Sequence, residues 1–146
     1  MRTITGKVIP GLHAGAENLK VQLPLVIEEF PEIRDTFLGT INLELDKGLL
    51  VLSSDHRTRP INWHPEHAPG EVFDFLRIRF EGPEGSQPIS AWLYIAHNSP
   101  HRSNLKIHEL IISSRAKVEV GSQCKIHLLR PSIELPYREY PIVVAF

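Results

Sequence analysis

The chain has 146 residues, a formal net charge of -1, 42% hydrophobic residues and 23% charged residues. These values are typical of a globular domain, and they exclude the disordered and collagen-like classes. A nearly neutral chain has no electrostatic basis for binding a polyanion, so we expect no nucleic-acid partner. At this length one domain can bury roughly two thirds of its unfolded surface, so we expect a single domain.

The N-terminal residues and the cysteine content predict the location of the protein. The stretch MRTITGKVIPG lacks the apolar core of a secretory signal, and no stretch approaches the roughly 18 apolar residues of a membrane span. The single cysteine, Cys124, alternates in phase with Ile126 and Leu128, which predicts a buried structural thiol in a reducing compartment. We therefore expect a cytoplasmic protein with no membrane partner.

The dominant pattern is a series of short runs in which apolar and polar residues alternate, separated by clusters of Gly, Pro, Asn and Ser. Such runs predict antiparallel strands. The predicted strands are residues 3–9, 17–23, 40–45, 49–53, 72–80, 89–96, 106–112, 123–129 and 141–145. So many strands in a short chain predict a mainly β fold, a small closed β-barrel, because closure removes unpaired strand edges.

One segment departs from the strand pattern and predicts a helix. Pro24 suits the first position of a helix, and Pro31 would break a longer one, so we expect one short helix near residues 25–30. Residues 59–71 are rich in proline and are expected to form a surface loop.

The end of the chain leaves two alternatives open. We assign residues 1–130 to the barrel and residues 131–146 to a C-terminal extension of the same domain. This extension carries three prolines before an apolar end. It either adds an edge strand or covers a partner subunit, and in the second case the protein is a homo-oligomer.

The stretch FLGTINLEL, residues 37–45, places two small oxygen-bearing side chains on one face of a strand. Because the side-chain period of a strand is two, Thr40 and Asn42 share one face. The opposite face carries the apolar residues Ile41, Leu43 and Leu45. Neutral oxygen ligands suit Mg²⁺, which commonly keeps substrate phosphates in its coordination shell, and Gly39 permits close approach of a phosphate. The same pattern also fits a plain solvated surface.

Three stretches occur in the order GKVIPGLHAGAENL, residues 6–19, then GTINLEL, residues 39–45, then SPHRSNLKIHELIISSRAKVEVGSQCKIHL, residues 99–128. In this order they resemble the archaeal-type CTP-dependent riboflavin kinases, a family of small six-stranded cradle-loop barrels. The resemblance implies a phosphotransferase that moves the γ-phosphate of CTP, or of another nucleoside triphosphate, to the ribityl hydroxyl of riboflavin. The product would be FMN, and the implied cofactor is Mg²⁺.

The resemblance also implies roles for individual residues. It assigns Thr40 and Asn42 to the metal, and Ser99 and Glu109 to the flavin. The nucleotide-binding residues that it implies are Leu12, His13, Ala14, Gly15, Ala16, Glu17, Ser114, Arg115, Ala116 and Lys117. Glu109 is the candidate catalytic residue, because a carboxylate can orient the ribityl hydroxyl or accept its proton. From its own neighbours, Glu109 equally fits an outward-facing position or a structural pair.

Other functions stay open at the level of the residues. The chain lacks both G-x-x-x-x-G-K-[ST] and a G-x-G-x-x-G after a strand, so any kinase activity needs an unrelated nucleotide site. The alternative is a non-catalytic barrel that binds a nucleotide or flavin as a sensor, or that serves as an oligomerisation scaffold. Eight histidines raise a zinc hypothesis, which the lack of a second cysteine and of an H-E-x-x-H helix disfavours.

Overall fold

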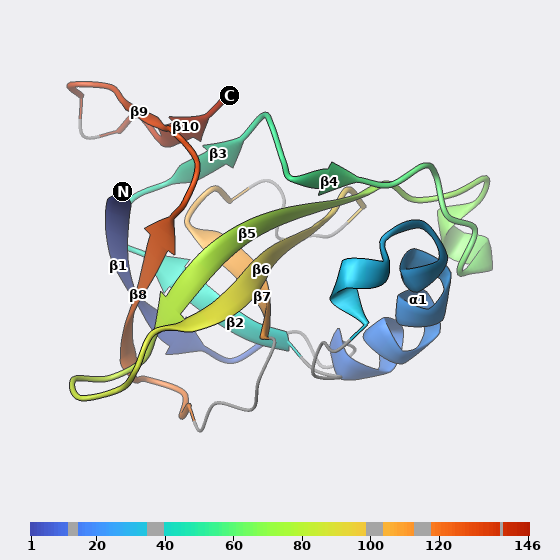
Figure 1. Ribbon diagram of the computed structural model, residues 1–146, viewed down its shortest axis with the longest axis horizontal. Helices are drawn as coiled ribbons and strands as arrows, with labels where there is room; N and C mark the ends of the chain where they lie inside the picture. The colour runs from blue at the N-terminus through green and yellow to red at the C-terminus, as the bar shows by residue number, and fades with distance from the viewer. Residues whose placement is uncertain (12–14, 35–39, 99–103, 113–117, 138) are drawn as a thin grey trace.

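Figure 1 shows the computed structural model of the chain, a twisted β-barrel with one long helix beside it. The structure describes residues 1–11, 15–34, 40–98, 104–112, 118–137 and 139–146. Its strands are β1 (Arg2–Ile9), β2 (Thr40–Leu45), β3 (Leu49–Val51), β4 (His56–Arg57), β5 (Phe73–Glu81), β6 (Ile89–Ala96), β7 (Ile107–Ile112), β8 (Gln123–Leu128), β9 (Ile133–Glu134) and β10 (Ile142–Val144). Its helices are α1 (Gly15–Glu29) and two short 3-10 helices, η1 (Pro31–Ile33) and η2 (Pro65–His67).

The barrel closes through the pairing of β5 with β8. Six strands follow one another in the order β5, β6, β7, β2, β1 and β8, and each neighbouring pair is antiparallel. β8 then returns to β5, with Ile78 opposite Leu128 and Glu81 opposite Lys125. The expected closed six-stranded β-barrel is therefore confirmed in the part of the chain that the structure describes. Closure lets the strands hydrogen-bond in a ring without a free barrel edge.

Alternation of side chains gives every barrel strand an inner and an outer face. The inner face is packed with large apolar side chains, among them Leu43, Leu76, Ile78, Leu93, Leu110 and Ile126. In β2, Leu43 and Leu45 are buried in this core and Ile41 packs against it, as the sequence predicts. Cys124 also lies in the core, where burial and then the charge of Asp46 raise the pKa of its thiol to about 11.

Helix α1 covers the outer face of the barrel at β5, β6 and β7. Its buried residues Leu19, Leu23 and Val26 belong to a second apolar cluster, which also contains Phe75 and Trp92 of the barrel wall. The two apolar clusters are thus separated by one layer of strands. The outer face of β6 and β7 is consequently an interior surface of the molecule wherever α1 covers it.

The strand predicted at residues 17–23 is wrong, because this segment lies within α1. Leu19 and Leu23 are buried while Val21 between them is 51% exposed, which is the spacing of a helix rather than of a strand. The predicted helix at 25–30 therefore begins ten residues too late. Pro24 lies inside the helix instead of at its first position, where it supplies no N–H to the helical hydrogen bonds.

The C-terminal extension forms a small second sheet. Strand β10 pairs in parallel with β3 and in antiparallel fashion with β9, and Figure 1 shows this sheet across one end of the barrel. Ile142 and Val144 are buried in the barrel core. Of the two alternatives for this segment, the structure contains the added strand.

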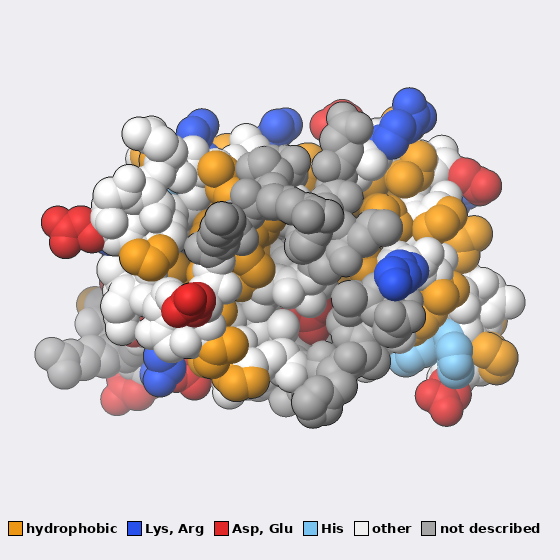
Figure 2. All heavy atoms as spheres, turned by 90° about the horizontal axis from the view of Figure 1, so that it is seen from below, with side chains coloured by type: hydrophobic (Ala, Val, Ile, Leu, Met, Phe, Trp, Pro, Cys, Tyr) orange, Lys and Arg blue, Asp and Glu red, His pale blue; other side chains and the backbone are white. Residues whose placement is uncertain are grey.

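Among the described residues, no helix has both the length and the apolar character that crossing a bilayer demands. On the face drawn in Figure 2, the basic and acidic side chains of the described residues are interspersed.

The C-terminal strand should contribute to the stability of the barrel. Ile142→Ala removes a buried side chain from the core and is expected to lower the free energy of unfolding by about 2–5 kcal/mol. Ile133→Ala is the matched control on the neighbouring strand β9. Ile133 is 44% exposed, so its loss should change the free energy by less than about 0.5 kcal/mol. Urea unfolding measures both, and equal effects would show that β10 is not part of the core.

Candidate functional site

Thr40 and Asn42 lie on the outer face of β2, as the alternation predicts. In the barrel register, Asn42 lies between Ile9 of β1 and Glu109 of β7, and Thr40 lies opposite Ile111. Directly opposed residues of an antiparallel pair project to the same face of a sheet. The structure therefore brings a predicted metal ligand, Asn42, beside the predicted catalytic residue, Glu109.

Asn42 is a buried amide with an unpaired oxygen. The residue is 7% exposed, and none of the described residues gives its Oδ1 a hydrogen bond. An unsatisfied buried polar atom costs about 1–3 kcal/mol, so it calls for a partner such as an ion, a water molecule or a ligand. Gly11 packs against this amide so closely that a Cβ there would lie 2.9 Å from Cγ of Asn42. Glycine at position 11 is thus required by the position of the Asn42 side chain.

Glu109 is a partly buried carboxyl group with a displaced pKa. Burial, and secondly the negative charge of Glu71, raise its pKa from 4.5 to about 7. A carboxyl group with this pKa can both accept and release a proton near neutral pH. The sequence left open whether Glu109 faces outward, and the register places it on the outer wall with Asn42.

Tyr94 completes the row of residues across the barrel wall. It lies opposite Glu109 in the β6–β7 pair, and its hydroxyl donates a hydrogen bond to Oε1 of Gln22 in α1. Burial, and then the charges of Glu109 and Glu71, raise the pKa of Tyr94 well above its ordinary value. The phenol is therefore a neutral hydrogen-bonding group that joins the helix to the wall beside Glu109.

Sequence reasoning missed Glu71. Residues 59–71, expected to be a surface loop, contain a β-bridge between Ile61 and Glu71 that buries the Glu71 side chain to 2% exposure. Its carboxylate accepts a hydrogen bond from Nε1 of Trp63 at 2.9 Å and another from the backbone N–H of Asn98 at 2.6 Å. The contact with Asn98 joins residues 27 positions apart, so a local pattern in residues 59–71 could not have indicated it.

The other predicted site residues divide into two groups. Gly15, Ala16 and Glu17 are the first three residues of α1, so their backbone N–H groups belong to the turn that has no hydrogen-bond partners inside the helix. The residues that lie outside the described part of the chain are Leu12, His13, Ala14, Ser99, Ser114, Arg115, Ala116 and Lys117.

Chain connectivity keeps the start of α1 near Asn42. Gly11 packs on the Asn42 amide, and Gly15 follows it by four residues, which can span at most roughly 14 Å. Figure 1 shows the start of α1 and the start of β2 on the same side of the barrel. A helix of 15 residues carries a partial positive charge at this end.

The donor atoms at this place suit a hard cation. The hydroxyl of Thr40 and the unpaired amide oxygen of Asn42 are neutral oxygen donors, and the carboxyl group of Glu109 lies beside them. Mg²⁺ accepts such a small protein contribution because phosphates and waters supply its other ligands. The described residues hold no group of three or more His, Cys, Asp or Glu placed to bind a metal, so nothing in them supports the zinc hypothesis.

Comparison with known proteins found no family model that matches the chain and no curated protein that matches it significantly. The fold and the site residues are consequently the basis for a functional proposal.

The raised pKa of Glu109 predicts a specific pH dependence of stability. The folded protein holds this proton up to about pH 7, whereas the unfolded chain releases it near pH 4.5. The stabilising contribution is therefore complete below pH 4.5 and is lost as the pH rises through 7. Relative to Glu109→Gln, the wild-type free energy of unfolding should fall by up to about 3 kcal/mol between pH 4.5 and pH 8. Urea unfolding at several pH values measures this difference, and a constant difference would contradict the assignment.

Proposed function

We propose that the protein is a Mg²⁺-dependent phosphotransferase of the riboflavin kinase type. It would transfer the γ-phosphate of CTP, or of another nucleoside triphosphate, to the ribityl hydroxyl of riboflavin. The observation that carries this proposal is the buried, unpaired oxygen of Asn42 beside the carboxyl group of Glu109 on the wall of a closed barrel. The sequence resemblance to the riboflavin kinases implies functional roles for the same two residues.

The proposed metal ligands are Thr40 and Asn42. A bound Mg²⁺ would supply neutralisation of the negative charge on the triphosphate. Asn42 is held ready for this role because Gly11 packs on its amide and the barrel register fixes its direction. The first turn of α1 offers backbone N–H groups and the positive end of the helix dipole to phosphate oxygens.

Glu109 is the proposed general base. Its pKa of about 7 leaves a large fraction ionised at neutral pH and still makes the carboxylate basic enough to take a proton. In the proposed reaction the ribityl oxygen forms a bond to the γ-phosphorus, the bond to the nucleoside diphosphate breaks, and Glu109 receives the hydroxyl proton. The neutral hydroxyl of Tyr94, held by Gln22, adds no competing charge beside this carboxylate.

We place this activity in the cytoplasm, where nucleoside triphosphates are abundant and the reduced thiol of Cys124 is stable. The competing function is a barrel that binds a nucleotide or flavin without turnover. Thermal unfolding with CTP, ATP, GTP or UTP, each with and without Mg²⁺ and riboflavin, measures binding, because a ligand of the folded state raises Tm. Chromatographic detection of FMN then separates a kinase from a binding protein. No FMN with any of the four nucleotides would overturn the proposed function.

Removal of either proposed metal ligand should abolish the response to Mg²⁺. We expect Thr40→Ala and Asn42→Ala each to lower kcat/KM by on the order of 100-fold, because the triphosphate loses its fixed cation. The control is Glu44→Gln, on the same face of the same strand, where the side chain forms an ion pair with Lys7 at 3.5 Å. This variant should retain wild-type activity. Unchanged Mg²⁺ dependence in both alanine variants would remove the metal assignment.

A further inference from the structure

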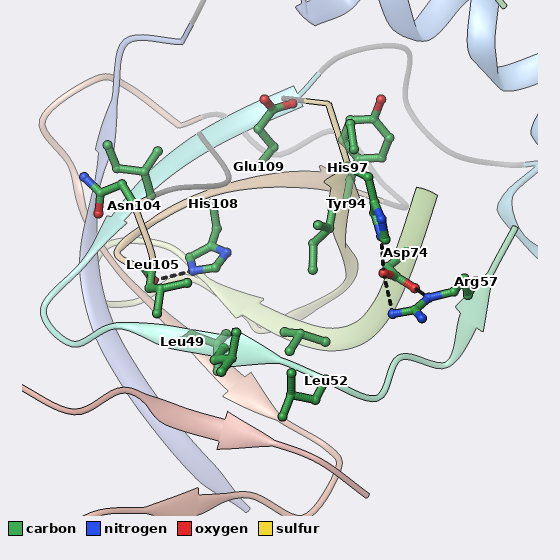
Figure 3. A pocket seen from close by; sticks show the side chains of 15 residues that line it. Leu49, Leu52, Arg57, Asp74, Tyr94, His97, Asn104, Leu105, His108 and Glu109 are labelled. Atoms are coloured by element: carbon green, nitrogen blue, oxygen red, sulfur yellow. Dashed lines mark hydrogen bonds and ion pairs between the residues drawn. The ribbon is translucent and has the colours of Figure 1, made fainter. Parts of the chain in front are cut away.

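The barrel contains a second candidate site, a cavity of about 330 Å³ at one end of its interior. At this end β5 has a different neighbour, because its residues 78–81 pair with β8 whereas its residues 74–75 pair with β4. The volume lies at the lower end of the range for small-molecule pockets. Figure 3 shows the residues that surround it.

The cavity has an apolar wall and a polar wall. The apolar side is formed by consecutive residues of β3 and the turn after it, with further residues from β6 and β7. The apolar lining residues are Leu49, Leu50, Val51, Leu52, Ile95, Ala96, Leu105 and Ile107. On the opposite side in Figure 3 lie Arg57, Asp74 and His97, which interact with one another.

Asp74 organises the polar wall. Its side chain is only 4% exposed, and it accepts hydrogen bonds from Oγ of Ser54 at 2.7 Å, Nε of Arg57 at 2.8 Å and Nε2 of His97 at 2.6 Å. Burial by itself would raise the pKa of Asp74, but the hydrogen bonds from Arg57, His97 and Ser54 hold it below its ordinary value. Asp74 is therefore ionised at neutral pH and fixes Arg57 and His97 at the cavity.

Asp74 interrupts the apolar inner face of β5. Farther along β5 the inner positions are Leu76, Ile78 and Phe80, all buried in the core. Burying a carboxylate costs free energy that an apolar side chain of similar size does not cost, so packing alone does not account for Asp74. The change from apolar to polar inner residues coincides with the cavity.

The cavity shares two lining residues with the proposed phosphotransfer site, Tyr94 and Glu109. Asp74 occupies an inner position of β5, whereas Tyr94 belongs to the cluster on the outer face under α1. Figure 3 shows the hydroxyl of Tyr94 and the carboxyl group of Glu109 pointing away from Leu49 and Leu52. The polar ends of these two side chains are thus directed away from the apolar wall of β3, and the polar wall of the cavity is formed by Arg57, Asp74 and His97.

We propose that this cavity binds a small, uncharged molecule with an apolar body and a hydrogen-bond acceptor directed at Arg57. The apolar wall of β3 favours the body of such a ligand. The guanidinium of Arg57 is already neutralised by its two hydrogen bonds to Asp74, so it offers N–H groups without net charge. An anionic ligand would lose its hydration and would gain no free counter-charge, which disfavours it.

The test compares two probes of nearly identical shape, 2-naphthamide and 2-naphthoate. Amide chemical shifts of the ¹⁵N-labelled full chain are followed during titration without nucleotide, Mg²⁺ or riboflavin, so the outcome does not depend on the proposed kinase activity. We expect 2-naphthamide to cause saturable shifts at residues 49–52 and 95–97, with a Kd on the order of 1 mM for a ligand of this size. 2-Naphthoate should bind at least about tenfold more weakly.

Two arginine variants complete the experiment. Arg57→Gln removes the proposed donor from a side chain that is more than half exposed, so the fold should survive, and the Kd of 2-naphthamide should rise at least about fivefold. Arg59→Gln makes the same change two residues away on an exposed side chain outside the cavity lining, and the Kd should not change. The proposal is overturned by absent saturable shifts, by equal or tighter binding of 2-naphthoate, or by an unaltered Kd in Arg57→Gln.

Discussion

The antiparallel pairing of β5 with β8 closes the barrel, and the remaining structure depends on this constraint. In a closed ring each strand has a fixed inner and outer face, since a slip of one residue would turn every side chain to the opposite face. The same register aligns Ile9, Asn42, Glu109 and Tyr94 across four neighbouring strands. The candidate site is thus a row of residues across the barrel wall, and the hydrogen-bonded strands hold these residues in fixed positions.

Two carboxyl groups in this small barrel show that neighbouring side chains decide whether the pKa of a buried carboxyl group lies above or below its ordinary value. Asp74 has three side chains that donate hydrogen bonds to it, and its pKa lies below the ordinary value. The pKa of Glu109 is raised by burial and by the charge of Glu71. The first group is a fixed anion that orients Arg57, whereas the second exchanges a proton near neutral pH. Only the second kind of environment suits a general base.

The barrel could be predicted from sequence where alternation was unambiguous. The faces of β2 and the bounds of β6 follow from period two alone, because inner residues such as Leu43 are apolar and outer ones such as Asn42 are polar. At residues 17–23 the same rule failed, because the spacing of Leu19 and Leu23 fits both the period of a strand and the period of a helix. The packing of this segment against Trp92 favours the helix. The cluster around Asp74 could not be predicted, because its members come from three separate segments that only the closed fold brings together.

Adjacent residues of β7 connect the cavity with the proposed phosphotransfer site, because both line the cavity. His108 lines the interior cavity and hydrogen-bonds through Nε2 to the carbonyl oxygen of Leu105 at 2.7 Å, while Glu109 lies on the outer wall opposite Asn42. A carbonyl only accepts hydrogen bonds, so in this contact Nε2 of His108 carries the proton. Because one peptide unit joins the two residues, barrel closure that fixes the position of one also fixes the position of the other.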